Sequence, residues 1–217
     1  MQCDDSKLCD EIAGAVDGIA FHEIYAGDPP SRIIGQSDNF LLICDISPIV
    51  AGHCLLVPRH HYLAFGHIPG NLANEFETFR AECEHLVGSI FGSPTVLEHG
   101  SSSTMSPSAC VTHAHCHIVP NAAASYDVFQ ADRLIGRRVS SWRALAEPAR
   151  NDRPYIYYRD PHAGDEYLFE DNLSKRHQYL RVVTAEVFDI PEPDWDWAMK
   201  IRKHLLRETV SRLAAFS

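Results

Sequence analysis

One stretch of the chain combines the alternation of a β-strand with an unusual choice of side chains: residues 110–120 read CVTHAHCHIVP. Because successive side chains of a strand point to opposite faces, His113, His115 and His117 are expected on one face and small or apolar residues on the other. Three polar rings in an apolar strand are costly to bury unless they are hydrogen-bonded or used in chemistry. We therefore expect a sheet strand here and seek the function at these three rings.

Apolar runs on both sides of a long helical pattern predict the fold class. Residues 40–44 and 52–58 are typical of strands, and they follow each other closely enough to pair antiparallel. Between residues 71 and 92, apolar side chains recur every three or four positions, which predicts one amphipathic helix. Residues 95–98 predict a further strand. The pattern favours an α+β fold, an antiparallel sheet with one main helix packed on it.

Beyond residue 121 the pattern changes. We interpret residues 1–121 as one domain, with an N-terminal segment, that holds the three histidines, and residues 122–217 as an α/β extension packed on it. The extension is predicted to contain a short helix at 141–147, a strand pair at 154–158 and 167–169, and helices at about 174–186 and 195–215. The basic residues of segment 174–181 either approach a phosphate at the start of a helix or form a solvated helix face.

Composition excludes several classes of function. The chain has 217 residues, with 29 Asp and Glu against 19 Lys and Arg. This acidic balance disfavours a nucleic-acid polymer as partner. No apolar run approaches the roughly 20 residues of a membrane span, and the N-terminus lacks the pattern of a signal peptide, so we expect no membrane and a cytoplasmic protein. None of the seven cysteines forms a C-x-x-C pair, and we expect them to be reduced.

Three imidazoles permit two chemistries. In the first, the rings bind a metal such as zinc, although no carboxylate lies in the strand and the central ring would be crowded. In the second, one neutral imidazole attacks phosphorus while the other rings bind phosphate oxygens. Attack is favoured when one ring nitrogen keeps its proton by donating to a backbone carbonyl, because the other nitrogen then has a free lone pair.

A family resemblance bears on this choice. Residues 113–119, HAHCHIV, resemble the His-x-His-x-His signature of the histidine-triad superfamily. Residues 45–61, DISPIVAGHCLLVPRHH, resemble the segment of that family in which an acidic or amide residue precedes Gly-His-x-Leu-x-x-Pro-x-x-His. The resemblance covers about residues 20–121. It implies a histidine-triad (HIT)-like sheet, a nucleotide substrate with purines favoured, no metal or cofactor, and a homodimer.

The resemblance also implies roles for individual residues. His115, the middle histidine, is the nucleophile that attacks the α-phosphorus of a nucleoside monophosphate derivative and forms a nucleotidyl-histidine intermediate. The derivative is a dinucleoside polyphosphate or a nucleoside phosphoramidate. His117 and His53 flank the phosphate, and His113 holds the geometry of the strand. Asp45 falls where the family binds the ribose hydroxyls, and a carboxylate suits two vicinal donors.

Further candidates surround this set. Many hydrolases of the family have Ser or Thr three residues before the first histidine; here Cys110, a weak donor, takes that position, and Ser108 is the nearby substitute. His99 is either a polar contact or a loop residue without function. Three side chains are candidates for lining a base pocket, with ordinary core packing as the alternative: Phe40, Leu42 and Ile46.

The third triad position favours hydrolysis. It is histidine rather than glutamine, which in the superfamily favours the hydrolases over the nucleotidyl transferases and phosphorylases. Three alternatives remain at this point: a transferase or phosphorylase, a non-catalytic nucleotide-binding protein, and a metal hydrolase.

Overall fold

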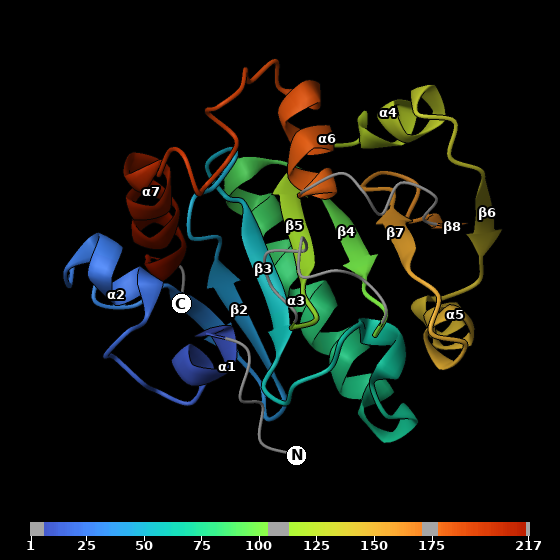
Figure 1. The fold of residues 1–217 in the computed structure, drawn as a ribbon, viewed down its shortest axis with the longest axis horizontal. Coiled ribbons are helices and arrows are strands. Elements are labelled where there is room, and N and C mark those ends of the chain that lie inside the picture. The colour runs from blue at the N-terminus through green and yellow to red at the C-terminus, as the bar shows by residue number, and fades with distance from the viewer. Residues whose placement is uncertain (1–6, 104–112, 171–177, 216–217) are drawn as a thin grey trace.

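The computed structural model describes residues 7–103, 113–170 and 178–215, and one eight-stranded sheet organises them (Figure 1). Every neighbouring pair of strands is antiparallel, and the strand order is β1-β2-β3-β5-β4-β7-β8-β6. The strands are β1 (Ile33–Gln36), β2 (Phe40–Cys44), β3 (Cys54–Pro58), β4 (Pro94–Gly100), β5 (Cys116–Pro120), β6 (Gly136–Val139), β7 (Tyr155–Arg159) and β8 (Glu166–Glu170).

One face of the sheet is covered by the long helix α3 (Ala73–Phe91), as the apolar periodicity predicts. Its buried side chains include Phe76, Phe79 and Cys83, which pack against alternate residues of the strands. The α+β class and the single main helix are therefore confirmed. The other helices are α1 (Lys7–Ile12), α2 (Ala20–Tyr25), α4 (Ser125–Ala131), α5 (Ala146–Arg150), α6 (Tyr179–Val187) and α7 (Lys203–Ala214), with 3₁₀ turns at Phe65–His67, Gly70–Leu72 and Trp142–Leu145.

The opposite face of the sheet carries the histidines. Leu55 of β3 pairs with His117 of β5, which pairs in turn with Leu97 of β4, so these side chains share a face. Figure 1 shows α3 behind the sheet and α1 and α6 in front of it. Leu8 of α1 belongs to the same apolar cluster as Leu55, while α6 packs against Leu97. A site on this face therefore lies between α1 and α6.

The C-terminal extension continues the sheet of the first part of the chain. Strand β7 pairs with β4 from Val96↔Arg159 to Gly100↔Tyr155. The hydroxyl of Tyr155 donates to Glu98 of β4 at 2.8 Å. Arg80 of α3 lies 3.6 Å from Glu166 of β8 and forms an ion pair with it. The extension thus supplies three strands to a sheet that it shares with residues 33–120.

Several predicted elements differ in their limits. The strand pair of the extension is present as β7 and β8, but the last helix begins at Lys203 rather than near residue 195. Strand β5 begins only at Cys116, so two of the three histidines precede it. The described cysteines, Cys9, Cys44, Cys54, Cys83 and Cys116, are free thiols, as expected. Over the described ranges, every helix is too short or too polar to cross a membrane.

Candidate active site

His53 and His117 form the centre of the site. His53 directly precedes β3 and His117 lies in β5, and the pairing of these two strands brings the rings together. The backbone N–H of Ile49 donates to Nδ1 of His53 at 3.2 Å, so the neutral ring carries its proton on Nε2. That proton is donated to Nδ1 of His117 at 2.9 Å. Neutral His117 then carries its own proton on Nε2 and is a hydrogen-bond donor there.

His115 has the opposite tautomer. Its Nδ1 lies 2.8 Å from the backbone carbonyl of His113 and donates to it, so Nε2 of the neutral ring has a free lone pair. The ring is half-buried, whereas His113 and His117 are buried. The centroids of the His115 and His117 rings are 5.1 Å apart. The site thus combines one ring that has a free lone pair with a neighbouring ring that is a hydrogen-bond donor. A nucleophile and a donor to the phosphate oxygens are the two functions used in nucleophilic attack on a phosphate.

Both ring nitrogens of His113 bond to groups other than His115 and His117. The prediction that His113 and His115 belong to the same strand as His117 is wrong, because the backbone before Cys116 bonds elsewhere: the N–H of Ala114 donates to the carbonyl of Tyr62 at 2.7 Å. Nε2 of His113 donates to the carbonyl of Pro58 at 2.7 Å. His113 therefore links the segment before β5 to the end of β3.

Asp45 lies beside this pair of histidines and is held from the C-terminal extension. Its Oδ1 accepts hydrogen bonds from Nη1 of Arg181 in α6 (3.0 Å) and from the N–H of Ser47 (2.8 Å). Its Oδ2 lies 3.9 Å from Nε2 of His53. Asp45 and Arg181 are each 5% exposed, so the ion pair is buried.

Burial keeps the imidazoles of the site neutral near pH 7. It lowers the pKa of His53 to about 4, against the attraction of Asp45, and it lowers the pKa of His113 to about 4. Burial also holds the pKa of His115 below its ordinary value and that of His117 well below it. Burial is the largest single influence on the Asp45 carboxyl and would raise its pKa. The guanidinium of Arg181, the rings of His53 and His117 and the N–H of Ser47 together outweigh burial and hold this pKa below the ordinary range.

The other predicted residues lie in different parts of the chain. His99 lies in β4 on the face of Leu97, and its charge contributes to the lowered pKa of His115. Ile46 packs in a separate apolar cluster with Tyr25 and Leu206. Cys110 and Ser108 lie outside the described residues.

The base-pocket assignment of Phe40 and Leu42 is corrected by the strand register. Both side chains are fully buried under α3. Leu42 pairs with Leu56, and His117 pairs with Leu55. Because Leu55 and Leu56 are consecutive in β3, they point to opposite faces, so Leu42 and His117 do so as well. The ring of Phe40 packs against Phe65 and Phe76. Both side chains are core residues, the alternative that the sequence also allowed.

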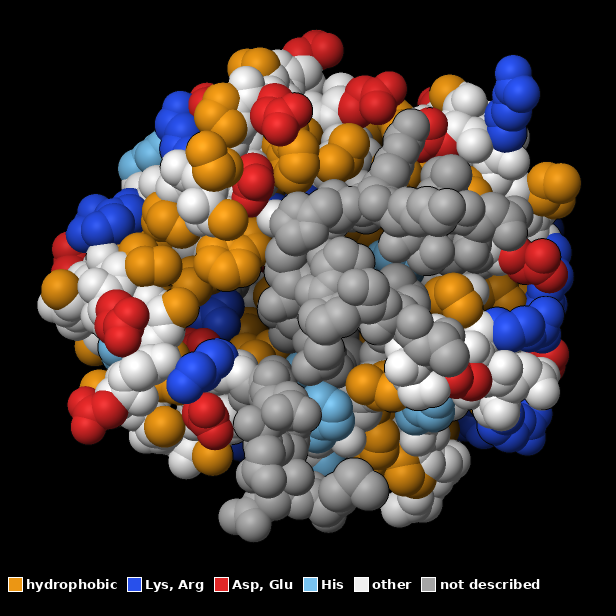
Figure 2. All heavy atoms as spheres, in the orientation of Figure 1, with side chains coloured by type: hydrophobic (Ala, Val, Ile, Leu, Met, Phe, Trp, Pro, Cys, Tyr) orange, Lys and Arg blue, Asp and Glu red, His pale blue; other side chains and the backbone are white. Residues whose placement is uncertain are grey.

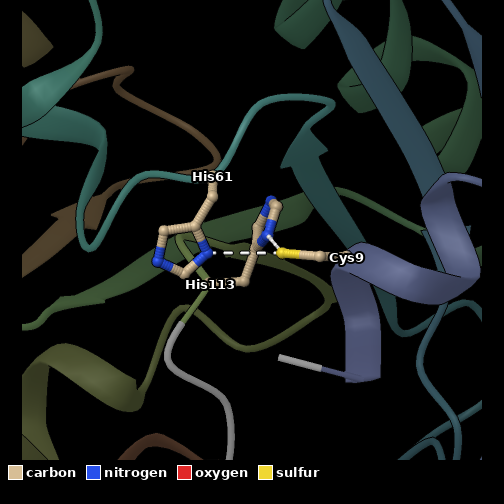
Figure 3. A group of neighbouring side chains, drawn as sticks. All are labelled: Cys9, His61 and His113. Carbon is tan, nitrogen blue, oxygen red and sulfur yellow. Dashed lines mark hydrogen bonds between the residues drawn. The ribbon is translucent and has the colours of Figure 1, made fainter. Parts of the chain in front are cut away.

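Among the residues that the structure describes, two groups of side chains bring metal-type donor atoms within 4.8 Å of one another. In the first, Asp45, His53 and His117, Oδ1 of Asp45 is bonded to Arg181, and Nε2 of His53 is bonded to Nδ1 of His117. In the second, Sγ of Cys9 lies 3.1 Å from Nδ1 of His113 and 3.3 Å from Nδ1 of His61 (Figure 3). A thiol with two imidazoles is a donor set that suits zinc. Figure 2 shows histidine side chains gathered near the centre of this face of the molecule.

Arg181, Cys9 and His61 are the residues that the sequence did not assign to the site. Arg181 lies in the basic segment 174–181, which suggested a phosphate contact but not a bond to Asp45. The sequence predicts only that Cys9 is reduced, and it places His61 at the end of the family-like segment 45–61 without a role. Nothing in the local sequence indicates that Cys9 and His113 meet across 104 positions.

Comparison with known proteins places the similarity in the part of the chain that holds the histidines. Residues 26–124 match the family model of the HIT domain. The chain is 28% identical over 101 residues to an uncharacterised HIT-like protein of Methanocaldococcus jannaschii, which is 46% of this chain and 76% of that protein. It is 28% identical over 103 residues to the protein Hit of Bacillus subtilis, covering 46% and 68% of the two chains.

Solved structures show lower similarity. A hypothetical protein from Leishmania major has 23% identity and a TM-score of 0.41, covering 55% of this chain and 75% of that one. A HIT-family member from Bacillus subtilis has 22% identity and a TM-score of 0.40, covering 54% and 73%. These matches extend over about half of the present chain.

Proposed function

Because the chain belongs to the histidine-triad superfamily, we propose that it is a nucleotide hydrolase in which Nε2 of His115 attacks the α-phosphorus of a nucleoside monophosphate derivative. The observation that carries the proposal is the 2.8 Å hydrogen bond from Nδ1 of His115 to the carbonyl of His113. This bond fixes the ring proton on the far side and leaves the Nε2 lone pair free. The ring is also half-buried, which is compatible with contact to a substrate.

The reaction has two displacement steps. In the first, the Nε2 lone pair of His115 forms a bond to phosphorus while the P–O or P–N bond to the leaving group breaks and the leaving group takes the bonding electrons. A phosphate leaves as the anion, whereas the nitrogen of a phosphoramidate takes a proton from solvent and leaves as the amine. The Nε2–H of His117 donates to a phosphate oxygen and stabilises the charge that develops there. In the second, water attacks phosphorus, the N–P bond breaks, and the nucleoside monophosphate and a free imidazole are released, with the water proton passing to solvent.

We propose the same substrate class that the resemblance implies, a dinucleoside polyphosphate or a nucleoside phosphoramidate with a purine base. For the ribose hydroxyls we propose Oδ2 of Asp45, since Oδ1 already accepts two hydrogen bonds. His99 is proposed as a further polar contact to the substrate. We further propose a cytoplasmic homodimer, which cell fractionation and light scattering test directly.

The test is detection of the covalent intermediate. The protein is mixed with a diadenosine polyphosphate and with adenosine phosphoramidate, quenched in neutral denaturant, and measured by intact mass. We expect an adenylyl adduct on the wild type and on His85→Ala, a control at an exposed histidine of α3. The adduct should be absent in His115→Ala. Equal turnover by the wild type and His115→Ala would refute the assignment of the nucleophile.

A further inference from the structure

The connection between β2 and β3, residues 45–53, carries a site residue at each end. Asp45 begins it and His53 ends it, and the N–H of Asp45 donates to the carbonyl of His53 at 3.1 Å. The placement of this one loop therefore sets the positions of both the carboxylate and the ring that bonds to His117.

The C-terminal extension holds this loop at several points. Arg181 donates from Nη1 to Oδ1 of Asp45 (3.0 Å) and from Nη2 to the carbonyl of Ser47 (2.7 Å). Further along the loop, the N–H of Gly52 donates to the hydroxyl of Thr209 in α7 at 2.8 Å. Arg202 donates from its backbone N–H to the hydroxyl of Ser47 and from its side chain to the carbonyl of Ile49. These partners lie 134 to 157 positions away from the loop residues that they bind.

Arg181 is the member of this set that acts on the histidine site most directly. Its guanidinium is fixed on its other edge as well, because Nε and Nη2 donate to the carbonyl of Trp195 at 3.0 and 2.8 Å. A buried ion pair contributes little net stability, because removing both charges from water offsets their attraction. A planar group bound on both edges does, however, hold its partners in one orientation.

Neighbouring side chains connect Arg181 to the proposed nucleophile through Asp45, His53 and His117. Asp45 Oδ2 lies 3.9 Å from Nε2 of His53, which donates to Nδ1 of His117 at 2.9 Å. The His117 ring lies beside the His115 ring, at a centroid distance of 5.1 Å. We propose that Arg181 of the C-terminal extension is a positioning residue of the histidine site, which orients Asp45 and His53 so that His117 presents its Nε2–H. The proposal rests on the proposed function of His115.

The test compares two buried arginines that both tie the extension to the first part of the chain. Arg181→Met removes the contact to Asp45. Arg80→Met is the matched control, since Arg80 is 8% exposed and pairs with Glu84 and Glu166 on the α3 side. In single-turnover experiments we expect Arg181→Met to slow adduct formation by on the order of 100-fold, as for a misplaced catalytic group. The rates are compared at saturating nucleotide, because Asp45 is also the proposed ribose ligand. Arg80→Met should keep a near-wild-type rate, and Arg181→Lys, which retains the charge, should recover part of the loss.

A second readout needs no substrate. Nitrogen NMR of the imidazoles reports which ring nitrogen carries the proton, and we expect His117 to be protonated on Nε2 in the wild type and to be a mixture of tautomers in Arg181→Met. An unchanged tautomer together with an unchanged rate would overturn the proposal, and so would a faster rate, which would mean that Arg181 blocks Asp45. Equal slowing in Arg80→Met would also overturn it. If the wild type forms no adduct, the proposed function fails, while the tautomer measurement still tests Arg181. If Arg181→Met does not fold, Arg181→Lys provides the same two comparisons.

Discussion

Glu98 is a buried carboxyl group whose ionisation we expect to control stability. It lies in β4 and is fully buried. Its Oε1 accepts a hydrogen bond from the N–H of Phe65 (2.7 Å) and its Oε2 accepts one from the hydroxyl of Tyr155 (2.8 Å). No lysine or arginine among the described residues forms an ion pair with it. Burial therefore outweighs these two hydrogen bonds and raises the pKa of Glu98 from 4.5 to about 7.

The raised pKa fixes the sign of the effect on stability. Between pH 4.5 and pH 7 the folded protein holds a proton on Glu98 that the unfolded chain has released, so folding takes up a proton. The stabilisation from this group is therefore fully present below the unfolded pKa and is lost as the pH rises through about 7. A difference of about 2.5 pKa units corresponds to about 3 kcal/mol, of which about 2–3 kcal/mol falls between pH 5 and pH 8.

The substitution Glu98→Gln isolates this contribution. The amide keeps the shape and the acceptor for Phe65, donates to the oxygen of Tyr155, and does not ionise. We expect the free energy of unfolding, measured with urea, to fall by about 2–3 kcal/mol more in the wild type than in the variant between pH 5 and pH 8. Glu82→Gln, at an exposed position of α3, should keep the wild-type dependence. Parallel stability curves for the wild type and Glu98→Gln would refute the reasoning, because other ionisable groups are the same in both proteins.

Three further predictions follow from the fold and the site. Phe40→Ala should lower the free energy of unfolding in urea by about 3–5 kcal/mol, because the ring fills the core, and should leave the nucleotide KM unchanged; a raised KM would return Phe40 to the base pocket. Gly52→Ala should lower the melting temperature, because Gly52 has φ +87° and an added Cβ would lie 2.6 Å from Cγ of Phe91; calorimetry with an unchanged Tm would contradict this. Chelation with EDTA should leave the rate of adduct formation unchanged, since each proposed step uses ring nitrogens; a loss that zinc reverses would overturn the metal-free proposal.

The parts of the fold that the sequence predicts are those set by local pattern. The apolar period of α3 and the runs of β2 and β3 are visible because burial of one face requires them. Alternation also shows which residues of β2 share a face, but it does not show which face carries the histidines. The sequence therefore allows Phe40 to line a base pocket, although its side chain lies on the opposite face of the sheet. The start of β5 was misjudged for a similar reason, since the bond from Ala114 to Tyr62 depends on a distant segment.

The site also depends on backbone groups that no side-chain motif contains. His53, His113 and His115 each have one ring nitrogen tied to the backbone, at Ile49, Pro58 and His113 respectively. These bonds decide which nitrogen carries the proton and therefore, in the proposed mechanism, which ring attacks phosphorus and which ring donates a hydrogen bond. The motif supplies the imidazoles, while the loop and strand ends assign their tautomers. A segment that fixes the loop, such as the C-terminal extension, can thus alter the chemistry of the rings without touching substrate.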